Sequence, residues 1–159
     1  MKVLFVCTGN VCRSPMATAI LRHLLDARGV TDIEVASAGT APWDGAPASE
    51  GAYLVSLEHG LDLSGHRARQ LTTDLVAGAG LVLGMGPHHV DRVGELGGAA
   101  KAHLLGAYAG EPPERAEVED PFGGTLEEYR TTYDRLVALL EAALPRLLAE
   151  RPDADPRSH

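Results

Sequence analysis

A short apolar run followed by a loop rich in glycine, cysteine and arginine constrains this chain more than any other feature. Val3 to Val6 form the run, and the next eight residues are Cys7-Thr8-Gly9-Asn10-Val11-Cys12-Arg13-Ser14. A continuous apolar run of this length is typical of a strand that is buried on both faces of a parallel sheet. Ser14 and Pro15 then predict the N-cap and the first residue of a helix. The chain is therefore expected to begin with a strand, a tight loop and a helix.

The rest of the chain alternates between strand and helix patterns. We expect further strands at 33–36, 81–83 and 102–105, and helices at 48–59, near 75–79, at 87–96 and at 126–150, with a kink or restart at Pro145. Such alternation predicts an α/β fold of three layers, α/β/α, around a parallel sheet. Ligands bind such folds at the carboxyl ends of the strands. The first strand delivers Cys7 to that edge.

Composition excludes several classes of protein. The 159 residues fit one domain, expected over 1–150, with a polar and disordered tail at 151–159. The net charge of −8 argues against nucleic-acid binding, and no apolar stretch is long enough to span a membrane. The two cysteines share one loop, which is not the disulfide framework of a secreted protein. These features predict a cytoplasmic domain in a reducing compartment.

The loop between the first strand and helix has the residue types of a cysteine-nucleophile phosphatase. A helix N-terminus, several inward N–H groups and Arg13 all favour the thiolate of Cys7. Arg13 suits bidentate contact with two phosphoryl oxygens, which lysine could not reproduce. Gly9 and Asn10 allow the loop to curl, and Ser14 can donate to the sulfur. We expect the residues between the cysteine and the helix to hold a phosphate, namely Thr8, Gly9, Asn10, Val11, Cys12 and Ser14.

Five segments resemble the low molecular weight protein tyrosine phosphatases. They are Val6 to Ala17, Ser37-Ala38-Gly39-Thr40, Gly65 to Leu71, Leu81 to Met85 and Asp120-Pro121-Phe122-Gly123-Gly124. The resemblance covers roughly residues 2 to 150. It implies a four-stranded parallel sheet and no metal or organic cofactor. It also implies that Asp120 is the general acid, that Ser37 and His66 support the loop through Asn10 and Ser14, and that Trp43 lines the pocket; Phe122 is a candidate for the opposite wall.

Several of these roles have a plainer alternative. From the residues alone, Glu117 or Glu119 is nearly as plausible an acid as Asp120. A lone tryptophan such as Trp43 is more often in the core, and His66 alone would be taken for a surface histidine. Cys12 is either a partner for a reversible disulfide with Cys7 or a small packed residue of the loop. His88 and His89 are predicted to lie on a solvated face, because adjacent side chains on a helix diverge and make a poor metal site.

The same loop chemistry admits more than one function. We favour hydrolysis of phosphotyrosine in proteins through a phosphocysteine, because Val11 offers an apolar surface to a phenyl ring. A branch of the family that hydrolyses phosphoarginine tends to have threonine there, and is the alternative. Arsenate reduction needs more cysteines than Cys7 and Cys12, and a non-catalytic phosphoprotein-binding module would not need Asp120. The expected partners are phosphorylated proteins and a cognate tyrosine kinase, with no nucleic acid and no membrane.

Overall fold

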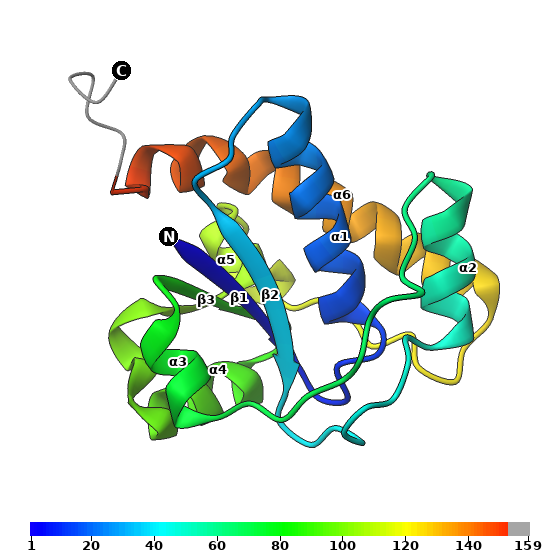
Figure 1. The fold of residues 1–159 in the computed structure, drawn as a ribbon, viewed down its shortest axis with the longest axis horizontal. Helices are drawn as coiled ribbons and strands as arrows, with labels where there is room; N and C mark the ends of the chain where they lie inside the picture. The colour runs from blue at the N-terminus through cyan, green and yellow to red at the C-terminus, as the bar shows by residue number, and fades with distance from the viewer. Residues whose placement is uncertain (153–159) are drawn as a thin grey trace.

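One four-stranded parallel sheet forms the centre of the molecule. The computed structural model describes residues 1–152. The strands are β1 (Lys2–Cys7), β2 (Glu34–Gly39), β3 (Leu81–Gly84) and β4 (Ala102–Leu104), and their order in the sheet is β2-β1-β3-β4 (Figure 1). The predicted parallel sheet is confirmed. Within the described residues, no helix has the length and apolar content that crossing a lipid bilayer requires.

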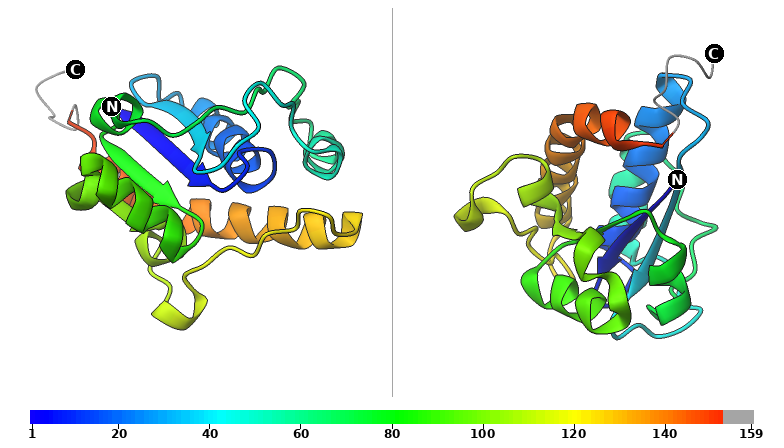
Figure 2. Two further views of the ribbon diagram at one scale, coloured as in Figure 1. Left: turned by 90° about the horizontal axis from the view of Figure 1, so that it is seen from below. Right: turned by 90° about the vertical axis from the view of Figure 1, so that its left-hand side faces the viewer.

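Helices cover both faces of the sheet. The helices are α1 (Arg13–Ala27), α2 (Glu50–Glu58), α3 (Thr73–Gly78), α4 (Pro87–Val93), α5 (Leu105–Tyr108) and α6 (Leu126–Glu150). A π-helical turn (Gly94–Gly98) and a 3-10 turn (Ala99–Lys101) connect α4 to β4, and a second 3-10 turn (Pro113–Arg115) lies between α5 and α6. Figure 2 shows α1 and α6 on one side of the sheet and α3 and α4 on the other.

The central strand β1 explains the apolar run at the N-terminus. Val3 and Phe5 are buried in the core that α1 and α6 cover, whereas Leu4 and Val6 are buried in the smaller core beneath α3 and α4. Because neighbouring side chains of a strand point to opposite faces, a strand covered on both sides has to be apolar at every position. The three-layer α/β/α prediction is confirmed.

The start of α1 differs from its prediction. The helix begins at Arg13, with Cys12 as an N-cap that makes no side-chain capping bond, so Ser14 is not the N-cap and Pro15 is the third helical residue. The hydroxyl of Ser14 instead contacts Cys7 and Asn10, which are better placed to use it than the helix backbone. The cap prediction was wrong because it considered only the residues adjacent in sequence.

The C-terminal half contains two further differences. Leu105 to Tyr108 form the short helix α5, whereas the predicted strand at 102–105 included Leu105. The helix α6 continues through Pro145 as one element, so the predicted restart is wrong. Pro145 has no N–H group to donate to the Glu141 carbonyl four residues earlier. Both residues are exposed, so water can hydrate this carbonyl. Of the predicted tail, residues 153–159 lie outside the described part of the chain, and Arg151 Nη1 lies 3.0 Å from Asp32 Oδ1.

Candidate active site

A cavity of about 500 Å³ opens at the carboxyl end of β1. Three segments distant in sequence enclose it: the loop after β1, the loop before α2 and the segment before α6. Its polar walls are Cys7, Thr8, Cys12, Arg13, Ser49 and Asp120, and its apolar walls include Val11, Ala41, Trp43, Pro47, Ala48 and Phe122. The cavity lies at the sheet edge where an α/β fold is expected to bind its ligand.

The loop after β1 leaves backbone donors free at this cavity. Among the backbone hydrogen bonds of turns and loops in the described part of the chain, none is donated by an N–H group of residues 8–12. The first N–H groups of α1 are likewise without helical partners, as at the start of any helix. A curled run of such groups next to a helix N-terminus is a binding site for an anion.

A hydrogen-bonded chain of side chains ends on the Cys7 sulfur. Asn10 Nδ2 donates to Ser14 Oγ at 2.8 Å and to Ser37 Oγ at 2.9 Å. Because Asn10 occupies a lone pair of the Ser14 oxygen, the Ser14 hydroxyl proton is free to point at Cys7 Sγ, 2.8 Å away. This donor stabilises negative charge on the sulfur, as a nucleophilic thiolate requires.

Asn10 is also held from the opposite side. It is fully buried, its Oδ1 accepts the Arg69 N–H at 3.0 Å, and its φ of 57° is left-handed. Its carbonyl accepts the Nε2–H of His66 at 2.6 Å. Burial is the main cause that lowers the pKa of His66. The structure therefore brings Ser37 and His66 into hydrogen-bond contact with Asn10 of the loop.

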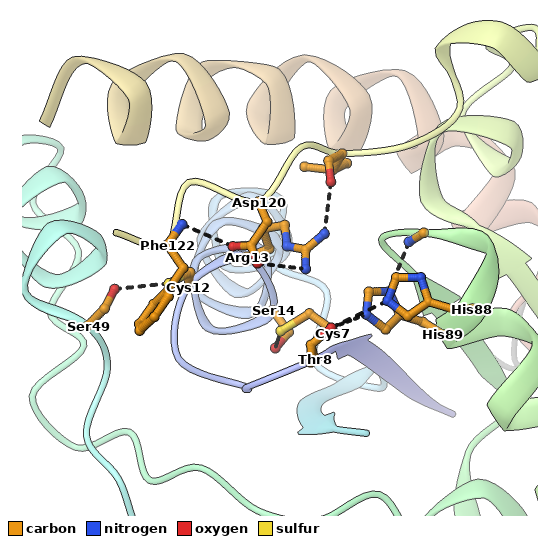
Figure 3. A network of polar contacts seen from close by, with 12 residues as sticks. Cys7, Thr8, Cys12, Arg13, Ser14, Ser49, His88, His89, Asp120 and Phe122 are labelled. Carbon is orange, nitrogen blue, oxygen red and sulfur yellow. Dashed lines mark hydrogen bonds and ion pairs between the residues drawn. The ribbon is translucent and has the colours of Figure 1, made fainter. Parts of the chain in front are cut away.

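Arg13 presents one edge of its guanidinium to the cavity. Nη1 donates to the Val118 carbonyl at 2.9 Å, and Nη2 lies 3.6 Å from Asp120 Oδ2 (Figure 3). Nε is buried and has no hydrogen-bond partner among the described residues. A buried, unpaired N–H is costly unless a ligand satisfies it. The Nε and Nη2 edge matches two oxygens of a tetrahedral anion.

Asp120, and not a neighbouring glutamate, reaches the nucleophile pocket. Its Oδ1 accepts the Phe122 N–H at 3.0 Å, which orients the carboxyl group, and 49% of its side-chain surface is exposed. Glu117 and Glu119 line a different hollow between the segment before α6 and α6 itself. A carboxyl group that is oriented in this way and open to solvent can give a proton to a leaving group or take one from a water molecule.

Two large aromatic side chains stand at the mouth of the cavity. Trp43 is 86% exposed and Phe122 is 68% exposed, and both line the cavity. Trp43 is therefore not a core residue. The loop that carries it is anchored to the site, because the Ser49 N–H donates to the Val11 carbonyl at 2.9 Å. Exposed aromatic residues around a hollow indicate a ligand that carries an apolar group.

The second cysteine lies in a separate polar environment. Cys12 Sγ lies 3.2 Å from Ser49 Oγ and 3.3 Å from Tyr129 Oη. Burial is the largest cause that raises the pKa of Cys12, which favours the neutral thiol. Both cysteines are free. The sequence pattern did not predict these two contacts, because both partners are distant from Cys12 in the chain. Ser49 lies 37 residues away and Tyr129, on α6, lies 117 residues away.

The prediction of a solvated face at His88 and His89 was wrong for His89. This side chain is fully buried, and its Nε2 lies 2.8 Å from Thr8 Oγ1 in the nucleophile loop (Figure 3). The helix α4 follows β3, which pairs with β1, so both strands end at the same edge. The position of α4 directly after a strand that ends at this edge was the signal from which a residue near the nucleophile loop could have been predicted. Within residues 1–152, no cluster of three His, Cys, Asp or Glu side chains has the arrangement of a metal site.

Comparison with known proteins gives a consistent result. The family model for low molecular weight phosphotyrosine protein phosphatase matches residues 2–153. A protein-arginine-phosphatase of Geobacillus stearothermophilus is 36% identical over 94% of this chain and 98% of its own length. The low molecular weight protein-tyrosine phosphatase A of Mycobacterium tuberculosis is 37% identical over 92% of this chain and 89% of its own length.

Solved structures of similar proteins share the fold. The low molecular weight protein tyrosine phosphatase from T. tengcongensis superposes with a TM-score of 0.85 at 40% identity, covering 92% of this chain and 99% of that one. A mutant of the YwlE arginine phosphatase, in which a phosphorylated serine replaces the active-site cysteine, superposes with a TM-score of 0.87 at 31% identity. That match covers 98% of this chain and 100% of the other.

Proposed function

The chain belongs to the low molecular weight phosphotyrosine protein phosphatase family and is a cysteine-dependent phosphomonoesterase, and we propose that it hydrolyses phosphotyrosine in proteins through a phosphocysteine intermediate. The observation that carries this proposal is the cavity itself. Cys7, the residues of its loop and Arg13, whose buried Nε has no partner among the described residues, line the cavity together with several apolar side chains.

The first step transfers the phosphoryl group to sulfur. The Arg13 edge and the loop N–H groups hold the phosphoryl oxygens, and Cys7 Sγ attacks phosphorus. The S–P bond forms as the bond from phosphorus to the tyrosine oxygen breaks. Protonated Asp120 gives its proton to that oxygen, so tyrosine leaves as a neutral phenol. Ser14 releases its hydrogen bond to the sulfur as the negative charge moves away.

The second step returns the enzyme to its starting state. A water molecule attacks phosphorus, and the Asp120 carboxylate takes the proton of this water. The S–P bond breaks, inorganic phosphate forms, and Ser14 again stabilises the thiolate of Cys7. The structure of the related arginine phosphatase with a phosphorylated serine at its active-site cysteine position supports a covalent intermediate at this point of the fold.

The walls favour phosphotyrosine over phosphoarginine. Val11 lies in the nucleophile loop and lines the cavity together with the exposed rings of Trp43 and Phe122. A phenyl ring has no polar group that would lose a hydrogen bond by contacting these side chains. A guanidinium placed against Val11 would leave N–H donors unpaired, at a cost of about 1–3 kcal/mol each.

One observation favours the alternative substrate. Relatives named protein-arginine-phosphatase and relatives named protein-tyrosine phosphatase match with nearly the same identity. The Asp120 carboxylate in the cavity is also a possible partner for a guanidinium. Hydrolysis of phosphoarginine is therefore the second candidate function.

A direct comparison of substrates tests the choice. We expect the wild-type protein to hydrolyse a phosphotyrosine peptide with a higher kcat/KM than a phosphoarginine peptide of the same sequence. Val11→Thr should shift this ratio toward phosphoarginine by about tenfold or more, because the threonine hydroxyl can accept a guanidinium N–H. Val11→Ile is the matched control and should keep the wild-type preference. A wild-type preference for phosphoarginine would reverse the proposal.

The setting of this activity follows from its chemistry. We propose phosphorylated proteins as substrates and a tyrosine kinase that produces them as a partner. The site uses the thiolate of Cys7, and both cysteines are free, so we place the enzyme in a reducing cytoplasm. The Cys7→Ser variant should stay folded and lose hydrolysis of p-nitrophenyl phosphate, which would exclude a pure binding module.

A further inference from the structure

A buried histidine outside the nucleophile loop contacts the first residue of that loop. His89 lies on α4, is fully buried, and its Nε2 is 2.8 Å from Thr8 Oγ1. Thr8 directly follows Cys7, and it lines the cavity. The mechanism described above assigns no role to this pair.

The hydrogen bonds of His89 fix which ring nitrogen carries the proton. The backbone N–H of Gly86 donates to His89 Nδ1 at 2.9 Å, so Nδ1 has no proton. The ring is neutral, because burial lowers the pKa of His89 to about 3. Its single proton is therefore on Nε2, and Nε2–H donates to the Thr8 hydroxyl.

This donor determines what the Thr8 hydroxyl can do. Because its oxygen already accepts from His89, the Thr8 hydroxyl proton has to point at another acceptor. His88 Nε2 is 3.4 Å from the same oxygen on the exposed side, a long contact that water can replace. The other side of Thr8 is the cavity, where the phosphoryl oxygens and the attacking water are expected.

We propose that His89 is a positioning residue of the phosphatase site, which acts through Thr8 by holding the start of the nucleophile loop and directing the Thr8 hydroxyl proton to an oxyanion in the cavity. A second bond holds the same residue, since the Ala41 N–H donates to the Thr8 carbonyl at 3.0 Å. Thr8 is thus fixed by its backbone from the loop after β2 and by its side chain from α4.

Two conservative variants separate the two hydrogen bonds of His89. An asparagine side chain can place its oxygen near the position of Nδ1 and keep the bond from Gly86, but it is too short to reach Thr8. A glutamine side chain can place its amide nitrogen near the position of Nε2 and keep the bond to Thr8. The proposal rests on the phosphatase activity proposed above, so both variants are assayed with p-nitrophenyl phosphate, which does not depend on the choice of protein substrate.

We expect His89→Asn to lower kcat/KM by about tenfold, and His89→Gln to stay within about threefold of the wild type. Thr8→Val should cause a similar loss, and Thr8→Ser, which keeps the hydroxyl group, should lose less activity than Thr8→Val. The double variant Thr8→Val with His89→Asn should be no slower than Thr8→Val alone, because the partner of His89 is already absent. His88→Ala is the matched control and should keep the wild-type rate.

Orthophosphate affinity, measured by calorimetry, gives a readout that does not need turnover. It should fall in Thr8→Val and His89→Asn, and it should fall less in His89→Gln and Thr8→Ser, which keep a donor or a hydroxyl group at the same position. Independent, multiplying losses in the double variant would overturn the proposal, and so would wild-type phosphate affinity in His89→Asn. If His89→Asn fails to fold, the comparison of Thr8→Val with Thr8→Ser and of His89→Gln with the wild type still decides. A wild-type protein that binds phosphate but hydrolyses nothing would contradict the proposed function and not this one.

Discussion

At the scale of single residues, the site depends on where the groups around Cys7 are held. Arg13 is fixed at one nitrogen by the Val118 carbonyl and keeps a buried Nε without a partner in the described chain. Asp120 is oriented by the Phe122 N–H and stays half exposed. A fixed cation with a free edge suits a phosphate that binds in one orientation, and an accessible carboxyl suits a group that has to exchange protons in both steps.

Replacing the proposed acid tests its identity. We expect Asp120→Asn to lower kcat by about 10²- to 10³-fold, because asparagine keeps the shape but cannot transfer the proton. The loss should be larger for phenyl phosphate than for p-nitrophenyl phosphate, since the poorer leaving group needs the proton more. Steady-state kinetics with both substrates measure this.

Glu117→Gln and Glu119→Gln are the matched controls for this experiment. Both glutamates line another hollow, so kcat should stay within about twofold of the wild type. A large loss in either control, together with a small loss in Asp120→Asn, would move the acid to that glutamate.

At the scale of elements, the nucleophile loop depends on close contact with the end of β2. A Cβ added at Gly39 would lie 2.5 Å from the Thr8 carbonyl oxygen and 3.0 Å from Asn10 Cβ. Both contacts are with the loop itself, so any side chain at this position displaces the phosphate site. The end of β2 thus packs directly against the loop and limits where the loop can lie. The strands β1 and β2 pair along their whole length.

We expect Gly39→Ala to lower kcat/KM for p-nitrophenyl phosphate by more than tenfold and to destabilise the protein by about 1–3 kcal/mol, as overpacking does. Gly78→Ala is the matched control, because a Cβ there meets nothing within 4 Å. It lies near the end of α3 and should be neutral or stabilising by up to about 1 kcal/mol. Activity assays and urea denaturation measure both effects, and normal activity in Gly39→Ala would show that the loop can shift without loss.

At the scale of the whole molecule, the buried His89 and the half-buried His66 make the stability depend on pH. Burial is the main cause that lowers the pKa of His89 to about 3 and lowers that of His66. Unfolding returns both to an ordinary value near 6.5, so below about pH 6.5 the unfolded chain binds more protons than the folded one. The contribution of these histidines to the free energy of unfolding is therefore fully present above this pH. It decreases as the pH falls toward their pKa values in the folded protein.

We expect the free energy of unfolding to decrease by about 2 kcal/mol between pH 7 and pH 5 through His89 alone. Glu58 and Glu150 have lowered pKa values, and their contribution is lost only below about pH 4.5, outside this range. Urea denaturation at pH 5, 6 and 7 measures the change. His89→Gln, which cannot take up the proton, should show a shallower dependence; curves parallel to the wild type would contradict the assignment.

Much of the fold and part of the site could be predicted because the evidence for them is local. The apolar run before Cys7 indicates a strand covered on both faces, and the alternation of patterns indicates the layers. Cys7 and Arg13 are chemically informative on one loop. Other predictions depended on local rules that tertiary contacts overrode. Ser14 had the sequence of a helix cap, but the sulfur of Cys7 and the amide of Asn10 took its hydroxyl.

The sequence by itself determined the strand, the loop and the nucleophile, because those residues are neighbours in the chain and share one element junction. Only the tertiary structure decided that Asp120 rather than Glu119 lines the cavity that contains Cys7, and that His89 lies against Thr8 rather than in water. These contacts bring together residues 81 or more positions apart. No periodicity spans such a distance, and the contacts form only when parallel strands end at a common edge and helices cover both faces of the sheet.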